Sequence, residues 1–337
     1  MADHSKIEWT DATWNPVTGC SVVSPGCTNC YAMQLAGTRL QHHPSRTGLT
    51  TMSKGGPVWN GQVRLNEQWI TQPLKWTRPR RIFVCAHGDL FHETVPDDWI
   101  DQVFAVMALC PQHQFQVLTK RSERMRDYLK LPPQTAPYIL GRTPLERVHF
   151  HAQGDGEPWD TLKRHGNLYS LYCSVPWPLP NVWLGVSVED QKRADERIPD
   201  LLATPAAVRF ASAEPLLGQI YFTGYLALLD WIIAGGESGR DARPMHPDWV
   251  RHIRDQCAAA GVPFFFKQWG EWAYASEDKN FDDAERHARL CFGPATEIIH
   301  ESSGNTRARV GKGRAGRLLD GVEHNGMPGA RAHRSTP

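Results

Sequence analysis

From residue 80 onward, short apolar runs alternate with longer stretches of helical periodicity. The runs are rich in β-branched and aromatic residues and apolar at successive positions, as expected of strands buried on both faces of a parallel sheet. They lie at residues 81–85, 114–118, 182–186, 208–211, 231–234 and 262–266. Between them, helical patterns cover residues 97–110, 122–129, 191–202 and 247–260. Pro247 lies at the start of the last pattern and Gly261 follows its end, as at many helix termini.

One further unit precedes these. A short strand near Thr13 leads into a loop, and residues 31–41 have the composition of a helix, whereas residues 42–62 are predicted to be irregular. About seven βα units favour an α/β fold of the partial TIM-like (β/α) barrel type with loop insertions. A Rossmann-like sheet is the alternative.

Polar residues follow nearly every predicted strand. In a barrel, such strand ends converge on one mouth, which is where active sites lie. These residues are His87 and Asp89; Lys120 and Arg121; Ser187 and Glu189; Ser212 and Glu214; Glu237 and Ser238; and Lys267. The barrel interpretation therefore also predicts a functional site.

Residues 1–300 are predicted to form the barrel, with an insertion at about residues 130–180 where Pro and Gly break the rhythm. Residues 301–337 form a basic, Gly- and Arg-rich C-terminal segment. Its basic run either binds phosphate or is a solvated tail. The run comprises Arg307, Arg309, Lys312, Arg314 and Arg317.

Charge and hydropathy limit the partners and the compartment that the chain can have. The 337 residues contain 37 Lys plus Arg against 36 Asp plus Glu, so no global field draws the chain to nucleic acid or to a membrane. No run of eighteen apolar residues and no apolar leader occurs, which predicts no membrane partner. Five cysteines are scattered singly, as suits a reducing compartment, so we expect a cytoplasmic protein.

Three of the eight cysteines are clustered with the spacing Cys20-x6-Cys27-x2-Cys30, among turn residues that let the loop fold back. Three thiolates leave one coordination position of a metal centre vacant, whereas a structural zinc site uses four protein ligands. The cluster therefore indicates a reactive metal centre. Two alternatives remain: a structural zinc site completed by His42 or His43, or three buried small side chains.

Several motifs resemble, in order, the blocks of a phage-associated radical-SAM-like family named for its three-cysteine motif. The first are Trp14-Asn15-Pro16, Gly19-Cys20, Ser24-Pro25-Gly26-Cys27 and Cys30-Tyr31-Ala32, and the later ones lie at residues 88–92, 118–121, 185–189, 234–239 and 316–321. The resemblance covers nearly the whole chain, except about residues 130–175 and the last few. Members are mostly of undefined function, and enzymes that repair DNA photoproducts are more distant relatives.

The resemblance implies a barrel of the radical-SAM type and an iron–sulfur loop at residues 19–31, with a [4Fe–4S] cluster on Cys20, Cys27 and Cys30. S-adenosyl-L-methionine (SAM) would bind the open iron, and a reductant supplying single electrons would trigger formation of a 5′-deoxyadenosyl radical. The candidate cofactor-binding residues are Glu189, Glu214, Gly235, Gly236, Glu237 and Ser238. Carboxylates in this set accept hydrogen bonds from ribose hydroxyls or an ammonium group.

The sequence departs from the usual radical-SAM pattern in three respects. The first cysteine spacing is x6 where x3 is commonest, and Asn29 precedes the third cysteine where an aromatic residue is usual. The Gly-Gly-Glu segment that begins at Gly235 follows a late strand instead of the second. These departures bear on the SAM contacts more than on the cluster.

The predicted function is a radical-SAM-like enzyme that modifies or repairs a phosphate-bearing substrate, such as a nucleic acid or nucleotide. Candidate substrate residues are His87, Asp89, His92, Lys120, Arg121 and Lys267. Lys120 and Arg121 either hold a phosphate or carboxylate or pair with neighbouring acids. The alternative function is a zinc-stabilised, non-catalytic nucleic-acid-binding protein, which the near-zero net charge disfavours. A nucleotide-using α/β enzyme has little support, because no Gly-x4-Gly-Lys-Ser/Thr loop is present.

Overall fold

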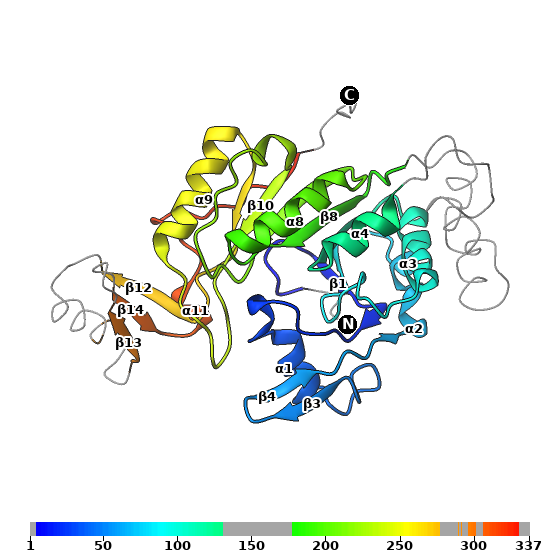
Figure 1. Cartoon of the computed structure of the whole chain (residues 1–337), viewed down its shortest axis with the longest axis horizontal. Coiled ribbons are helices and arrows are strands. Elements are labelled where there is room, and N and C mark those ends of the chain that lie inside the picture. The colour runs from blue at the N-terminus through cyan, green and yellow to red at the C-terminus, as the bar shows by residue number, and fades with distance from the viewer. Residues whose placement is uncertain are drawn as a thin grey trace.

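A seven-stranded parallel sheet forms the centre of the protein (Figure 1). The computed structural model describes residues 5–130, 177–276, 289, 291, 296–300 and 306–329, so the insertion expected at about 130–180 lies almost entirely outside the described residues. The strands, in their order across the sheet, are β1 (Ala12–Trp14), β6 (Arg81–Val84), β7 (Gln114–Thr119), β8 (Val182–Ser187), β9 (Val208–Ala213), β10 (Trp231–Ala234) and β11 (Phe264–Phe266).

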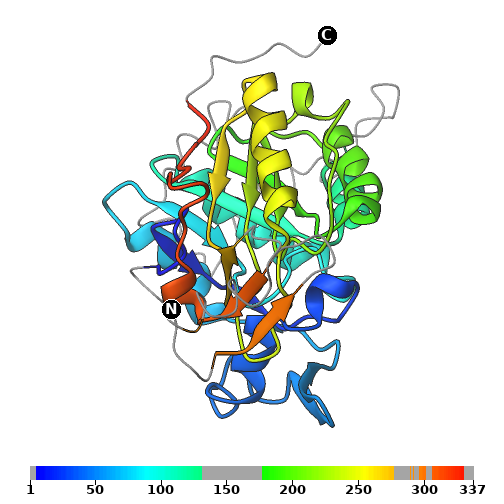
Figure 2. The ribbon, with the colours of Figure 1, turned by 90° about the vertical axis from the view of Figure 1, so that its left-hand side faces the viewer.

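The order of the strands in space equals their order along the chain. A Rossmann-like sheet reverses its order at a switch point, whereas successive βα units that wind in one direction build a barrel. The sheet curls into a half-barrel (Figure 2), and in the described residues β1 does not pair with β11. The prediction of a partial TIM-like barrel is therefore confirmed, and the Rossmann alternative is wrong for this chain.

Helices cover the outer face of the sheet (Figure 1). They are α3 (Asp97–Leu109), α4 (Ser122–Leu129), α8 (Gln191–Ala203) and α9 (Pro247–Ala260). Local sequence fixes their ends: Asp190 accepts a hydrogen bond from the Arg193 amide at the start of α8, and Gly261, with φ of 64°, ends α9. The predicted start and stop of α9 are confirmed.

Aromatic side chains fill the concave face near the amino ends of the strands. Together with Ala86 and Ile233 they form one buried cluster, the aromatic cluster. Its aromatic members are Trp9, Phe83, Trp183, Phe210, Trp231 and Phe265. Gly185 on β8 leaves room for this cluster, because a Cβ there would lie 2.4 Å from the Phe210 ring. The C-terminal segment closes the open side of the half-barrel, where Asn325 bridges to Phe265 and the Trp231 indole donates to the Gly326 carbonyl (2.7 Å).

A small lobe follows β1. It contains β2 (Val17–Thr18), η1 (Pro25–Cys27), α1 (Tyr31–Gly37), β3 (Thr50–Ser53), β4 (Gly56–Trp59) and β5 (Arg64–Leu65), and is followed by α2 (Glu67–Ile70) and η2 (Gln72–Lys75). The helix is shorter than predicted, and residues 42–62 contain the β3–β4 hairpin instead of irregular chain alone. The hairpin packs on α1, a tertiary contact that local composition does not reveal.

The C-terminal part is built into the molecule. A three-stranded antiparallel sheet joins β12 (Trp272–Ser276), β14 (Thr306–Arg309) and β13 (Ile298–His300), and α11 (Lys312–Ala315) follows. Elsewhere in the chain, the short 3-10 helix η3 (Leu226–Leu228) lies between β9 and β10 of the central sheet. The domain division expected at residue 300 thus falls within this sheet. In the part of the chain that the structure describes, no helix has the length and apolarity needed to cross a membrane.

Candidate functional site

The cysteine loop leaves the carboxyl end of β1 through a close backbone contact. Gly19 has φ of 95° and bridges to Gly88 after β6, and a Cβ on Gly19 would lie 2.1 Å from the Gln62 carbonyl oxygen. Only glycine fits this position without movement of the backbone. The loop then passes through the 3-10 turn η1 and enters α1 with Cys30 at its N-cap.

The three clustered cysteines line one cavity of about 430 Å³ at the carboxyl ends of the strands. Cys27 is buried and Cys20 and Cys30 are half-buried, and all three are free thiols. In the described residues, no three His, Cys, Asp or Glu side chains lie close enough together to hold a single metal ion. A cluster of several iron atoms spaces its ligands more widely than one ion does, so three thiols around one cavity are the donor set that such a cluster requires.

Strand-end residues form the other walls of this cavity. Those that the sequence predicted and that line it are Asp89, Lys120, Arg121, Ser187, Ser212, Glu214, Gly236, Glu237, Ser238 and Lys267. The prediction that strand ends converge with the cysteine loop on one mouth is thus confirmed for these residues. His87, His92, Glu189 and Gly235 are not among the lining residues.

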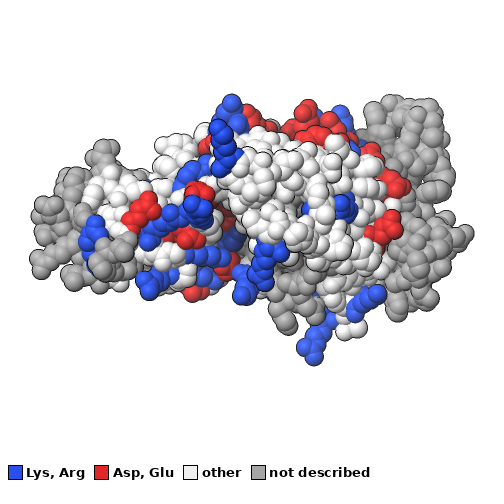
Figure 3. Space-filling view, turned by 90° about the horizontal axis from the view of Figure 1, so that it is seen from below, with Lys and Arg blue, Asp and Glu red and all other residues white. Residues whose placement is uncertain are grey.

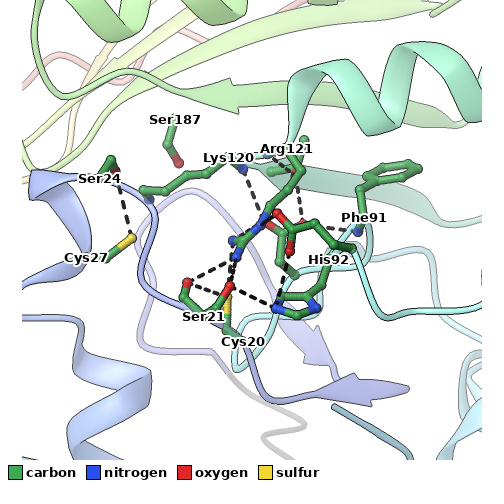
Figure 4. Close-up of polar contacts among 12 residues, drawn as sticks. Cys20, Ser21, Ser24, Cys27, Phe91, His92, Lys120, Arg121 and Ser187 are labelled. Atoms are coloured by element: carbon green, nitrogen blue, oxygen red, sulfur yellow. Dashed lines mark hydrogen bonds and ion pairs between the residues drawn. The ribbon is translucent and has the colours of Figure 1, made fainter. Parts of the chain in front are cut away.

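A first buried carboxylate fastens the loop at Cys20. Asp89 forms an ion pair with Arg121 (3.2 Å), and both side chains are less than a tenth exposed. Arg121 in turn donates to the Cys20 sulfur (3.2 Å) and to the Ser21 carbonyl oxygen (3.0 Å), as Figure 4 shows. His92 reaches the same segment through its Nε2, which lies 2.9 Å from the Ser21 hydroxyl.

A second carboxylate fastens the loop next to Cys27. Glu189 is fully buried, accepts from the Gly26 amide (3.2 Å) and pairs with Arg197 of α8 (2.9 Å). Burial would raise the pKa of Glu189, but Arg197, Lys120 and the loop donors outweigh burial and lower the pKa below its ordinary value. Glu189 is therefore an anion whose oxygens are already bound by the protein.

A third carboxylate fastens the loop next to Cys30. Glu237 accepts from the Asn29 side-chain amide (2.9 Å) and from Arg243 (2.9 Å), and Arg243 also donates to the Pro25 carbonyl oxygen (2.9 Å). The loop is thus tied beside each cysteine to a different strand end of the half-barrel. Such support from surrounding side chains is what orients metal ligands.

Comparison with known proteins adds a family. The profile of the DUF5131 family, described as a protein of unknown function, matches residues 4–328. The chain belongs to the DUF5131 family. No curated protein and no solved structure matches it.

Further along the cavity of this DUF5131 protein, Glu214 and Lys267 form a pair of their own. The Lys267 ammonium lies 3.1 Å from the Glu214 carboxylate, which also accepts from the Ser212 hydroxyl (3.1 Å). Gly235 makes room for this pair, because a Cβ there would lie 2.8 Å from a Glu214 oxygen. A Cβ on Gly236 would lie 1.9 Å from the Trp269 carbonyl, so this glycine serves backbone packing.

Lys120 is placed differently from Arg121. Its side chain runs from the end of β7 toward Ser187 and the segment that carries Cys27 (Figure 4). In the described residues no carboxylate forms an ion pair with its ammonium group, although its charge helps to lower the pKa of Glu189. Lys120 is therefore a cation available to an anionic ligand in the cavity.

The basic C-terminal run does not act as one surface. Arg307 is buried, Arg309 pairs with Glu297 (3.3 Å) and Arg317 with Glu323 (3.6 Å). Lys312 alone of this run lines the cavity, where it pairs with Glu8 (3.1 Å). The described part of this segment is folded into the molecule and is not a solvated tail, whereas phosphate binding by the run stays a prediction.

Sequence reasoning did not single out the cations that hold the carboxylates, Arg197 and Arg243. Arg197 of α8 donates to the Ser187 carbonyl oxygen and to Glu189. It lies eight residues after Glu189, and this spacing matches no sequence motif. Asn29 was noted only as a departure from the radical-SAM pattern, yet it bonds both Glu237 and the Asp241 carbonyl (2.6 Å). A conspicuous polar residue between two of the clustered cysteines was the available signal.

Proposed function

We propose that this DUF5131 protein is a radical-SAM-like iron–sulfur enzyme that modifies or repairs a phosphate-bearing substrate. The observation that carries the proposal is the shared cavity: three thiols from one loop meet the strand ends of a half-barrel. The resemblance of its motifs to the three-cysteine radical-SAM-like family gives the cofactor. The proposal places the enzyme in the cytoplasm, where a cellular reductant supplies single electrons.

Cys20, Cys27 and Cys30 would hold a [4Fe–4S] cluster in this arrangement. When bound, the cluster and SAM supply a 5′-deoxyadenosyl radical by one-electron cleavage of the sulfonium. The protein's own task is to keep the loop in place and to exclude water. The buried carboxylates serve the first task, because Asp89 holds Arg121 and Glu189 accepts from the Gly26 amide of the loop.

Two parts of the cavity suit the amino-acid part and the ribose of SAM. Glu214, with Ser212 beside it, offers acceptors for an ammonium group or ribose hydroxyls, and Lys267 limits how much negative charge it presents. Lys120 offers a cation for a carboxylate or phosphate group. Glu189 and Glu237, whose oxygens serve the loop, are supporting residues in this proposal.

The charge of the cavity supports a substrate that carries phosphate. Five of its lining side chains are cationic and three are anionic: Lys6, Lys120, Arg121, Lys267 and Lys312 against Asp89, Glu214 and Glu237. Outside the cavity, basic and acidic side chains are interspersed on the face in Figure 3. The substrate is accordingly expected to make few phosphate contacts, and a nucleotide or a short stretch of nucleic acid meets that requirement better than a long duplex.

The zinc-stabilised alternative has less support from the site. A structural zinc ion needs four ligands around one point, and no such group occurs in the described residues. His43 lies against Ser45 (2.7 Å), and neither His42 nor His43 lines the cavity.

The experiment is to incubate anaerobically reconstituted, dithionite-reduced protein with SAM and to measure 5′-deoxyadenosine. We expect slow formation without substrate, no formation in Cys30→Ala, and retained formation in Cys85→Ala. Cys85 lines the same cavity outside the motif, which makes it the matched control. Absence of product together with no SAM-dependent change in the EPR signal of the reduced cluster would instead indicate an electron-transfer or structural cluster.

A further inference from the structure

Cys20 differs from the other two clustered cysteines in what touches its sulfur. The Arg121 guanidinium donates to the Cys20 Sγ from 3.2 Å, and its other terminal nitrogen binds the Ser21 carbonyl (3.0 Å) and hydroxyl (2.8 Å). Among the described residues, Cys27 Sγ has only a long contact with the Ser24 hydroxyl (3.8 Å). A fixed cation thus lies on one side of the cysteine loop, against one thiol.

Arg121 cannot swing away from this position without breaking several bonds. Its side chain is 5% exposed and pairs with Asp89 (3.2 Å) and Glu93 (3.2 Å). Asp89 is itself fixed, because it accepts from the Thr119 hydroxyl (2.6 Å) and the Phe91 amide (3.0 Å). An arginine guanidinium does not lose its proton in proteins, so this side chain stays charged.

The contact strengthens when Cys20 binds a metal. A metal-bound cysteine is a thiolate, and a hydrogen bond from a cation to a thiolate is stronger than one to a thiol.

We propose that Arg121 is the positioning residue that raises the reduction potential of the cluster, by donating to the Cys20 sulfur. This inference rests on the proposed function. A cluster that gains an electron becomes more negative, and hydrogen bonds and positive charge at its sulfurs stabilise that reduced form. Because Arg121 touches Cys20, the effect enters through one defined ligand.

The test is the midpoint potential of the reconstituted cluster in the full-length protein, measured by EPR-monitored redox titration without SAM or substrate. For Arg121→Gln we expect at least a tenfold less favourable one-electron reduction, which corresponds to a shift of about 59 mV toward negative values. Arg121→Lys keeps the positive charge but loses the two-pronged guanidinium. The midpoint potential of its cluster is expected to lie between those of wild type and Arg121→Gln.

Arg243→Gln is the matched control. Arg243 also binds the cysteine loop, at the Pro25 carbonyl, and also pairs with a buried carboxylate, but it touches no sulfur. Its loss is expected to speed the release of iron without moving the potential. If Arg121 only supported the loop, Arg121→Gln would have the same effect as Arg243→Gln. The two variants therefore separate an effect on the reduction potential from an effect on cluster retention.

An Arg121→Gln cluster with the wild-type potential overturns the inference while the proposed function stands. If Arg121→Gln retains no cluster, Arg121→Lys decides: a lowered potential supports the inference, and the wild-type potential overturns it. A wild-type protein that takes up no labile sulfide overturns the proposed function itself, and the inference with it.

Discussion

The two ends of the half-barrel interior are built from the same strands but have opposite chemistry. Near the amino ends, the inward-facing side chains form the aromatic cluster that includes Trp183, Phe210 and Trp231. Near the carboxyl ends, charged and hydroxyl-bearing side chains surround the cavity, and Trp9, Phe83 and Ala86 of the aromatic cluster also line it. One end is a packed core and the other is a site.

Strand periodicity explains how one strand serves both ends. Along β9 and its extension, Phe210 belongs to the aromatic cluster, and Ser212 and Glu214, at steps of two, line the cavity. Along β11 and the residue that follows it, Phe265 belongs to the aromatic cluster and Lys267 lines the cavity. Alternate residues face the same side of a strand, so a change from aromatic to polar along one face marks where the core ends. Along β9 and β11, the packed core and the site therefore occupy different positions on the same strand.

The largest effect that would test this separation is at the aromatic end. Trp231 is fully buried among Trp9, Trp183 and Phe210, so Trp231→Ala should lower the free energy of unfolding by about 3–5 kcal/mol. Trp249→Ala, at a half-buried position on α9, should cost less. Urea denaturation of both variants measures the difference. A Trp231→Ala protein that folds should still take up a full cluster, and loss of the cluster would show that the two ends are not separable.

At the cavity end, a smaller effect is expected from Glu189→Gln. The change removes a charged acceptor of the Gly26 amide and leaves the buried Arg197 without its counter-charge, so unfolding should become easier by about 1.5–3 kcal/mol. Unlike Trp231→Ala, it should also speed the release of iron from the reconstituted cluster. Unchanged iron retention would mean that the loop does not depend on this carboxylate.

The smallest effect concerns pH and acts through His87, which follows the carboxyl end of β6. Burial, assisted by Arg46, lowers the pKa of His87 to about 4. The unfolded chain therefore binds a proton at this position between about pH 6.5 and pH 4 that the folded chain does not.

Stability should consequently be full above about pH 6.5 and fall as the pH drops toward 4, by at most about 1.4 kcal/mol per pH unit from this group. Burial also lowers the pKa values of His113 and His324, so the informative quantity is the difference between wild type and His87→Gln. Denaturation at pH 7, 6 and 5 should give a shallower dependence in the variant. Equal slopes would contradict the assigned direction.

Much of the fold was predictable because its strands are apolar on both faces and its helix ends carry local signals, as at Pro247 and Gly261. The β3–β4 hairpin was not, since its packing on α1 is tertiary. At the site, the cysteine spacing and the acids at strand ends were visible in the sequence. What those acids bind was not, because Glu189 meets Gly26 and Glu237 meets Asn29 across separations of 163 and 208 residues.

The central claim is that the loop holds an iron–sulfur cluster, and metal and sulfide analysis of the anaerobically reconstituted protein tests it most directly. We predict about four iron and four labile sulfide per chain in wild type and in Cys85→Ala, and loss of the intact cluster in Cys27→Ala. Stoichiometric zinc without labile sulfide, or a Cys27→Ala variant that keeps the full cluster, would contradict the claim.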